Sequence, residues 1–222
     1  MNRLILGLLI LLLISGLGNV SAQKIRGGFT LGMNMSQVDG DEIYGFRKYG
    51  FHGGAIGTVP LEKNFMITLE TLYSQKGANQ PGRTQYYRQY RVDLDYVEVP
   101  VLLQYNDKDI FTVGAGFAYG RLVSVKEWEK GVRTSTTLQG SNAHFDRADY
   151  LALIDLKFRI VHRLSMNVRY QYSMDKIRVA QFSDDFQQRF WERKQYNNVL
   201  TFRVAYIFND PLPPPKGQQG ND

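Results

Sequence analysis

The chain has 222 residues, carries a formal net charge of +6 and contains no cysteine. Its length allows one large domain or two small ones, and the lack of thiols excludes disulfides and thiolate metal sites. After the first 22 residues, no stretch approaches the roughly 18 consecutive apolar residues of a transmembrane helix.

The N-terminal segment is typical of a secretory signal peptide. Asn2 and Arg3 form a short basic region, residues 4–13 form an almost unbroken apolar run, and Val20-Ser21-Ala22 offers small side chains for cleavage. We therefore expect Sec-type export with cleavage near Ala22, which leaves a mature chain beginning at Gln23. An exported chain without a transmembrane helix is either a soluble periplasmic protein or an outer-membrane β-barrel.

Eight later segments alternate apolar and polar residues with the period of two that is typical of a β-strand. They span residues 26–36, 49–59, 65–74, 92–105, 110–125, 150–161, 164–173 and 200–208. Each provides roughly the 9 to 11 residues that a tilted strand needs to cross a bilayer. Several polar faces carry a charge in mid-segment, which an apolar soluble core would not accommodate.

The connections between these segments alternate strictly between long and short. The short ones are 60–64, 106–109 and 162–163, and the long ones are 37–48, 77–91, 126–149 and 179–194. This asymmetry is typical of outer-membrane barrels, which have tight periplasmic turns and long outer loops. We therefore predict an all-β fold over residues 23–209: a closed, antiparallel, eight-stranded transmembrane β-barrel with its polar faces inside.

Aromatic residues and prolines mark the limits of the predicted barrel. Aromatic side chains gather near the segment ends, as in the interfacial girdles of membrane barrels: Phe65, Tyr105, Phe111, Tyr206 and Phe208 at the periplasmic rim, and Tyr49, Tyr73, Tyr150, Tyr172 and Tyr196 at the outer rim. Residues 210–222 are proline-rich and polar, so we expect an extended or disordered periplasmic tail.

Pro100 falls inside the fourth segment, where it removes one hydrogen-bond donor from the sheet. We therefore expect a β-bulge or local bend at Pro100, with a missing bond that is tolerated in place as the alternative.

Three stretches resemble one family of bacterial proteins. They are LETLYSQKG at 69–77, YVEVPVLLQY at 96–105 and GAGFAYG at 114–120. They are similar to the porin-like outer-membrane β-barrel proteins of Bacteroidetes, often called the PorT family, over most of the mature chain. The resemblance implies an eight-stranded outer-membrane barrel. The family is functionally broad: its namesake takes part in type IX secretion and gliding, while most members have no assigned activity.

Charged residues on the inward faces form the main candidate site. Glu70 and Glu98 are expected near mid-membrane on neighbouring strands, with arginines on the strands across the barrel. Paired carboxylates can act as general acid and base. Charges inside a membrane protein are nevertheless costly unless they are paired, and an eight-stranded barrel is filled by its own side chains. We therefore predict a structural lumen charge network of Glu70, Glu98, Asp155, Arg159, Arg169 and Arg203.

The second long connection is basic and aromatic. At the outer surface its arginines can form bidentate bonds to lipopolysaccharide phosphates or contact a protein partner. An ordinary solvated strand extension is the alternative, and export makes a nucleic-acid partner inconsistent with the rest of the chain. The candidate contact residues are Arg83, Tyr86, Tyr87, Arg88 and Arg91.

The three histidines, His52, His144 and His162, lie too far apart in the predicted topology to form a metal site. We expect neither a metal nor a cofactor. His52 beside a serine near the outer rim is the one arrangement that would give a nucleophilic enzyme of the lipid A-modifying kind.

Three function classes remain. The leading one is a non-enzymatic structural or accessory barrel that recruits partners through its outer loops or C-terminal tail, with the link to type IX secretion that the resemblance implies. The second is a narrow passive pore for small solutes. The third is a lipid A-modifying enzyme.

Overall fold

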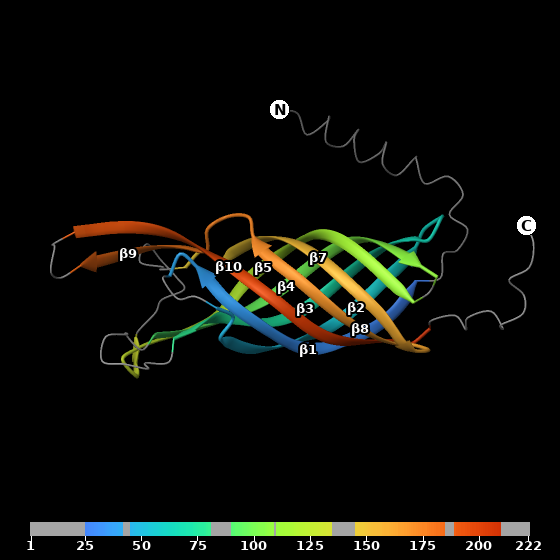
Figure 1. Ribbon diagram of the computed structural model, residues 1–222, viewed down its shortest axis with the longest axis horizontal. Coiled ribbons are helices and arrows are strands. Elements are labelled where there is room, and N and C mark those ends of the chain that lie inside the picture. Colours follow the sequence, from blue (N-terminus) through green and yellow to red (C-terminus); the bar gives the residue numbers. More distant parts are fainter. Residues whose placement is uncertain are drawn as a thin grey trace, which may run out of the picture.

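The computed structural model describes residues 25–41, 45–80, 90–108, 110–134, 145–184 and 189–209. Within this part of the chain, ten strands form a single antiparallel sheet (Figure 1). Their bounds are β1 Arg26–Asp39, β2 Lys48–Pro60, β3 Phe65–Gln80, β4 Tyr90–Asp107, β5 Phe111–Glu129, β6 Val132–Thr134, β7 Ala148–Val161, β8 Leu164–Ser173, β9 Arg178–Asp184 and β10 Arg189–Ile207.

Eight of these strands close into a barrel. The sheet follows the order β1-β2-β3-β4-β5-β7-β8-β10, and β10 pairs with β1 from Gly28↔Ile207 to Asp39↔Tyr196. The two remaining strands are additions to the ring, since β6 pairs with β5 and β9 pairs with β10. The predicted fold class is therefore confirmed. Closure leaves the membrane part without an open sheet edge, which lipid could not satisfy.

Short turns and both ends of the barrel wall meet at one rim. Single turns join β2 to β3, β4 to β5 and β7 to β8. At the same rim, the backbone N–H of Gly27 donates to Asn209 Oδ1 at 3.0 Å, and Asn209 Nδ2 donates to the Ile25 carbonyl at 2.7 Å. In outer-membrane barrels the short turns face the periplasm, so this is the periplasmic rim.

The barrel exposes apolar side chains and buries polar ones. Phe29, Leu31, Leu69, Leu103 and Phe117 are each more than half exposed on the outer wall. The buried polar residues include Asn34, Thr68, Gln104, Asn167, Gln171 and Thr201. The apolar outer wall can face lipid, while the polar side chains fill the lumen. The described residues include no helix that is long and apolar enough to cross a membrane.

The strands on the outer side are longer than a bilayer requires. Strands β3, β4, β5 and β10 have 16, 18, 19 and 19 residues, against roughly 10 for a membrane crossing. Parts of the predicted long loops are therefore strand. We call residues 75–80, 90–96 and 121–129 the outer extension. In Figure 1, β9 and the adjoining part of β10 also project beyond the barrel.

The outer extension encloses an apolar cluster, which we call the outer core. Its buried members are Val38, Ala78, Val92, Leu94, Tyr96, Leu122, Phe145 and Ile177. The loops predicted over these residues are therefore partly wrong: the strands continue beyond the membrane and pack apolar side chains inside, as in a soluble protein.

One β-bulge separates the two parts of β5. The pairing of β4 with β5 shifts between Asp95↔Ser124 and Tyr96↔Leu122, so Val123 is the extra residue. A one-residue shift moves side chains to the other face, and Val125 and Glu127 therefore turn inward beyond it. The bulge predicted at Pro100 is wrong: Pro100 pairs with Ala118 without a shift in register.

Candidate functional site

Four charged side chains meet in the middle of the barrel. We call Glu70, Asp155, Arg169 and Arg203 the central cluster. Glu70 comes from β3, Asp155 and its cross-strand neighbour Arg169 from β7 and β8, and Arg203 from β10. Each of the four residues is at most 2% exposed.

Glu70 is the acceptor that holds both arginines. Arg169 donates to its two oxygens at 2.8 and 3.0 Å, and Arg203 donates to the same two oxygens at 2.9 and 2.9 Å. Two bidentate guanidinium contacts on one carboxylate fix its position from two strands. The result is a brace across the lumen from β3 to β8 and β10.

Asp155 completes the charge balance. It accepts from Arg169 Nε at 2.9 Å, from Arg203 at 3.2 Å and from Asn167 at 3.0 Å. The central cluster thus holds two carboxylates against two guanidiniums. Because every member is buried and bonded to another, the arrangement is that of a filled and charge-balanced interior.

Glu98 does not join the central cluster and instead forms a second one with Lys76 and Asp149. Glu98 pairs with Lys76, whose Nζ also lies 3.8 Å from Asp149, and all three side chains are fully buried. The prediction that Glu98 belongs with Arg169 and Arg203 is therefore wrong. The register pairs Leu72 with Glu98, so Glu98 lies two residues nearer the outer rim than the position opposite Glu70. Two residues correspond to about 7 Å along a strand.

Lys76 and Asp149 were missed by the sequence analysis. Lys76 falls between the predicted strand 65–74 and the predicted loop 77–91, and Asp149 is the last residue of the predicted loop 126–149. A signal was available, since Lys76 continues the inward row of β3 that contains Glu70 and Ser74. Asp149 likewise continues the inward row of β7 two positions beyond Leu151.

A third charged group lies in the outer extension. The Tyr90 hydroxyl donates to Glu127 at 2.5 Å, and Arg178 donates to Glu127 at 2.8 Å and to the Tyr90 oxygen at 2.9 Å. Arg178 also lies over the ring of Phe145, 4.4 Å from its centroid. Burial raises the pKa of the Tyr90 hydroxyl above its ordinary value, so Tyr90 stays protonated and keeps donating.

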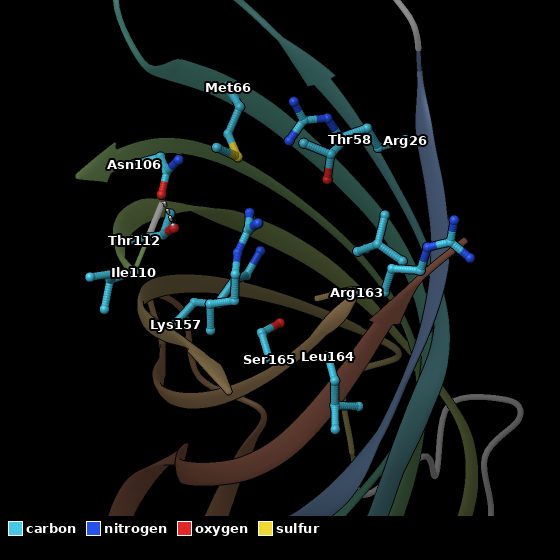
Figure 2. Close-up of a pocket in the computed structure, with 12 residues that line it drawn as sticks. Arg26, Thr58, Met66, Asn106, Ile110, Thr112, Lys157, Arg163, Leu164 and Ser165 are labelled. Atoms are coloured by element: carbon cyan, nitrogen blue, oxygen red, sulfur yellow. Dashed lines mark hydrogen bonds between the residues drawn. The ribbon is translucent and has the colours of Figure 1, made fainter. Parts of the chain in front are cut away.

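Arg159 lies away from the central cluster, at the periplasmic mouth of the barrel. There it lines a cavity of about 50 Å³ together with Lys157 from the same strand. Figure 2 shows the labelled lining residues around this space, with Thr112 bonded to Asn106. The inclusion of Arg159 in the lumen network is thus a second correction. Along β7, Arg159 lies four residues beyond Asp155 towards the periplasmic turn, which is about 13 Å along a strand.

His52 lies next to a serine, but inside the barrel. Its Nδ1 is 3.4 Å from Ser74 Oγ, and both residues are fully buried. The lipid A-modifying alternative needs a nucleophile exposed at the outer rim, and this pair does not provide one. His162 lies in a periplasmic turn, and His144 lies outside the described residues. The described part of the chain has no group of three or more residues suited to hold a metal ion.

Of the predicted outer contact residues, only Arg91 lies within the described part. It donates to both oxygens of Asp93, at 2.9 and 2.7 Å, and its guanidinium lies 5.0 Å from the centroid of the Trp128 ring. Arg83, Tyr86, Tyr87 and Arg88 lie outside the described residues.

A closed antiparallel barrel with an apolar outer wall and a charge-balanced interior is the architecture of a β-barrel membrane protein. The chain belongs to the family described as outer membrane protein beta-barrel domain, whose model matches residues 21–178. It is therefore an outer-membrane β-barrel protein.

Solved structures with a similar architecture share little sequence with the chain. Ail of Yersinia pestis has a TM-score of 0.49 and 12% identity, covering 82% of this chain and 98% of its own. Neisserial surface protein A has a TM-score of 0.47 and 7% identity, covering 82% and 97%. The outer membrane protease OmpT from Escherichia coli has a TM-score of 0.33 and 9% identity, covering 83% and 95%. No curated protein matches the chain.

Proposed function

We propose that this protein is a non-enzymatic and non-conducting outer-membrane scaffold that recruits a partner at the cell surface. The observation that carries the proposal is the buried brace of Arg169 and Arg203 on Glu70 across the lumen. A small barrel whose interior is filled by paired charged side chains conducts ions poorly. Its function then lies on its surfaces.

The outer extension is the surface best suited to recruitment. The outer core packs Leu94, Tyr96 and Phe145 inside it, which makes it a rigid platform outside the membrane. Arg91 lies half exposed on its wall. Arg83, Tyr86, Tyr87 and Arg88 precede it in the sequence, and with Arg91 they are the basic and aromatic residues that we propose contact lipopolysaccharide phosphates or an acidic protein face.

The organisation of the chain follows from the same proposal. Residues 1–22 act as a signal peptide, residues 23–209 form the barrel, and residues 210–222 form a periplasmic tail that can hold a further partner. The resemblance to PorT-like proteins of Bacteroidetes supports a place beside the type IX secretion machinery.

Planar-bilayer recording of the refolded protein tests the non-conducting part. We expect no stable unitary conductance for the wild type. Stable openings of constant size would contradict the proposal and favour the passive-pore alternative. A Glu70→Gln variant provides the comparison, because loosening the brace is the change most able to create a leak.

A matched pair of triple variants tests the surface part. Replacing Arg83, Arg88 and Arg91 with Ser should lower the lipopolysaccharide phosphate that co-purifies with the protein. Replacing Lys63, Lys108 and Arg163 with Ser removes the same charge at the periplasmic rim and should leave it unchanged. Equal co-purification from both variants would remove lipopolysaccharide from the proposal.

The two alternatives lack a supporting contact in the described residues. A pore needs an open path, and the central cluster lies across it. A lipid A-modifying enzyme needs an accessible nucleophile, and Ser74 beside His52 is 0% exposed.

A further inference from the structure

We propose that the second cluster, formed by Lys76, Glu98 and Asp149, binds one proton, which Asp149 holds at neutral pH. This proton ties the outer extension to the barrel more firmly in acid than in alkaline surroundings. The proposal concerns the interior of the molecule and is independent of the proposed recruitment function.

The second cluster has fewer cations than carboxyl groups. Lys76 pairs with Glu98, and its Nζ lies 3.8 Å from Asp149, so one ammonium serves two carboxyl groups. All three side chains are fully buried. The central cluster, which is equally buried, has two carboxylates against two guanidiniums. An uncompensated buried charge is costly, and a buried group avoids this cost by becoming neutral.

Lys76 is the one cation among the groups that face Asp149 in the described part of the chain. The polar and charged groups around Asp149 are Lys76 on β3, Tyr96 and Glu98 on β4, Ser173 on β8 and Asn197 on β10. On β5 the facing residue is Gly120, which pairs with both Glu98 and Asp149 and has no side chain.

Two titratable groups lie just beyond this shell. His52 on β2 contacts Ser74, two residues before Lys76 on β3. Asp146, which precedes β7 and lies near Tyr96, is exposed and pairs with Lys176 at 3.6 Å. Neither group adds a positive charge that could balance Asp149.

Two buried oxygen atoms indicate where the proton binds. Asn197 Nδ2 donates to Asp149 Oδ2 at 2.8 Å. Within the described residues, the Oδ1 atoms of both side chains are buried and have no hydrogen-bond partner. Both atoms are acceptors while Asp149 is ionised. A proton on Asp149 Oδ1 supplies the missing donor, and an acid and an amide can then form two hydrogen bonds to each other.

The second cluster lies next to the outer core. Tyr96, a fully buried member of the outer core, accepts from Asn197 Nδ2 at 3.3 Å, and Lys76 Nζ lies 5.1 Å from the centroid of its ring. Lys76 and Tyr96 belong to the outer extension, whereas Asp149 and Asn197 belong to β7 and β10 of the barrel wall. The protonation of Asp149 therefore affects how firmly the outer extension is held.

The direction of the pH effect follows from the number of bound protons. When the outer extension opens locally, Asp149 meets water and ionises as an ordinary aspartate does above about pH 4. The folded state then binds one proton more than the open state, so its stability falls as the pH rises. The loss ends at the pH at which Asp149 also ionises in the folded protein.

Infrared spectroscopy of the refolded protein in lipid vesicles at neutral pH detects the proton directly. We expect the carbonyl band of one protonated carboxyl group. The band should shift when aspartate is isotope-labelled at its side-chain carboxyl, stay in place when glutamate is labelled, and disappear in Asp149→Asn. Absence of the band from the wild type overturns the proposal. A band that shifts only with labelled glutamate, or that persists in Asp149→Asn, overturns it as well.

Hydrogen exchange of residues 90–96 measures the effect on the outer extension. The protection in Asp149→Asn, divided by that in the wild type, should rise by up to about tenfold per pH unit between about pH 5 and 7, because the new amide needs no proton. Asp155→Asn makes the same change in the balanced central cluster, so it should weaken the barrel and give no such rise.

A protection ratio that does not change with pH, or that rises equally in Asp155→Asn, overturns the proposal. If Asp149→Asn does not fold, the labelled bands of the wild type still decide the question.

Discussion

Strand β4 passes through two environments that pack its side chains in opposite ways. From Val97 to Tyr105 the outward residues are apolar and exposed, while Glu98 and Gln104 are buried inside. Toward the other end of the strand, Leu94 is fully buried and Arg91 lies on the outer wall. One strand thus shows a membrane pattern in one half and a soluble pattern in the other.

The medium around each half explains the difference. Lipid outside the membrane half accepts apolar side chains, so charges gather inside and must be paired there. Water outside the outer extension accepts charges, so apolar side chains gather inside. The two halves should therefore respond differently to mutation: loss of one charge should affect the whole barrel, whereas loss of one apolar side chain should affect the extension alone.

The largest effect is expected from Glu70→Gln. This change keeps the side-chain volume but leaves Arg169 and Arg203 with Asp155 as their remaining carboxylate in the central cluster. Removing one partner of a buried ion-pair group costs about 3–5 kcal/mol. The loss in the free energy of unfolding is measured by urea unfolding of the refolded protein in lipid vesicles, followed by tryptophan fluorescence.

Glu62→Gln serves as the matched control, because Glu62 is exposed in a periplasmic turn. We expect a change below about 0.5 kcal/mol there. If Glu70→Gln lowers the free energy of unfolding as little as Glu62→Gln does, the central cluster does not stabilise the barrel.

The next effect is expected from Leu94→Ala in the outer core. Leu94 is fully buried, and such a truncation costs about 2–4 kcal/mol. Hydrogen exchange should lose protection in the outer extension, while the membrane half of β4 keeps it. Leu103→Ala, on the lipid-facing part of the same strand, is the control. Equal loss of protection along all of β4 would show that the two halves unfold as one unit.

The sequence predicts the membrane half of this molecule better than its outer half. Alternation assigns strands there because lipid and lumen impose opposite polarity on successive residues, and short turns give the topology. The same alternation places Glu70, Asp155, Arg169 and Arg203 on inward faces, and the structure has these side chains in contact. The level of a side chain along the barrel axis is harder to predict than its face, because the level depends on the register between strands.

Register is the reason that Glu98 was grouped with the wrong arginines. Its partners Lys76 and Asp149 come from β3 and β7, and stagger between strands decides which residues share a level. The bulge at Val123 is a further example, because no sequence feature there marks an extra residue. That bulge turns Glu127 inward, and the third charged group depends on it.

An intermediate effect is expected from Tyr90→Phe. The change removes the hydroxyl that donates to Glu127 and accepts from Arg178, which should cost about 1–2 kcal/mol. This loss of stability in the outer extension is measured by hydrogen exchange in residues 121–129. Tyr119→Phe is the control, because Tyr119 is exposed. If the two variants exchange alike, the third charged group does not hold the extension together.

The smallest effect is expected from Arg91→Ser on the outer wall. Arg91 is half exposed, and its bond to Asp93 is worth at most about 1 kcal/mol and weakens with salt. Partial burial opposes ionisation of Asp93, but hydrogen bonds from Arg91 and Lys48 outweigh it and hold the pKa of that carboxyl below its ordinary value.

The sign of the pH dependence follows from that lowered pKa. Asp93 contributes its stability fully above its ordinary pKa of about 3.9, and the contribution is lost as the pH falls through the lower folded value. The difference in hydrogen-exchange protection of residues 90–96 between wild type and Arg91→Ser should therefore be constant from about pH 7 to 5 and shrink below about pH 4. A difference that stays the same below about pH 4 would mean that Arg91 acts through its contact with Trp128, which does not titrate, and not through Asp93. The outer wall would then be held by the same kind of packing as the outer core beneath it.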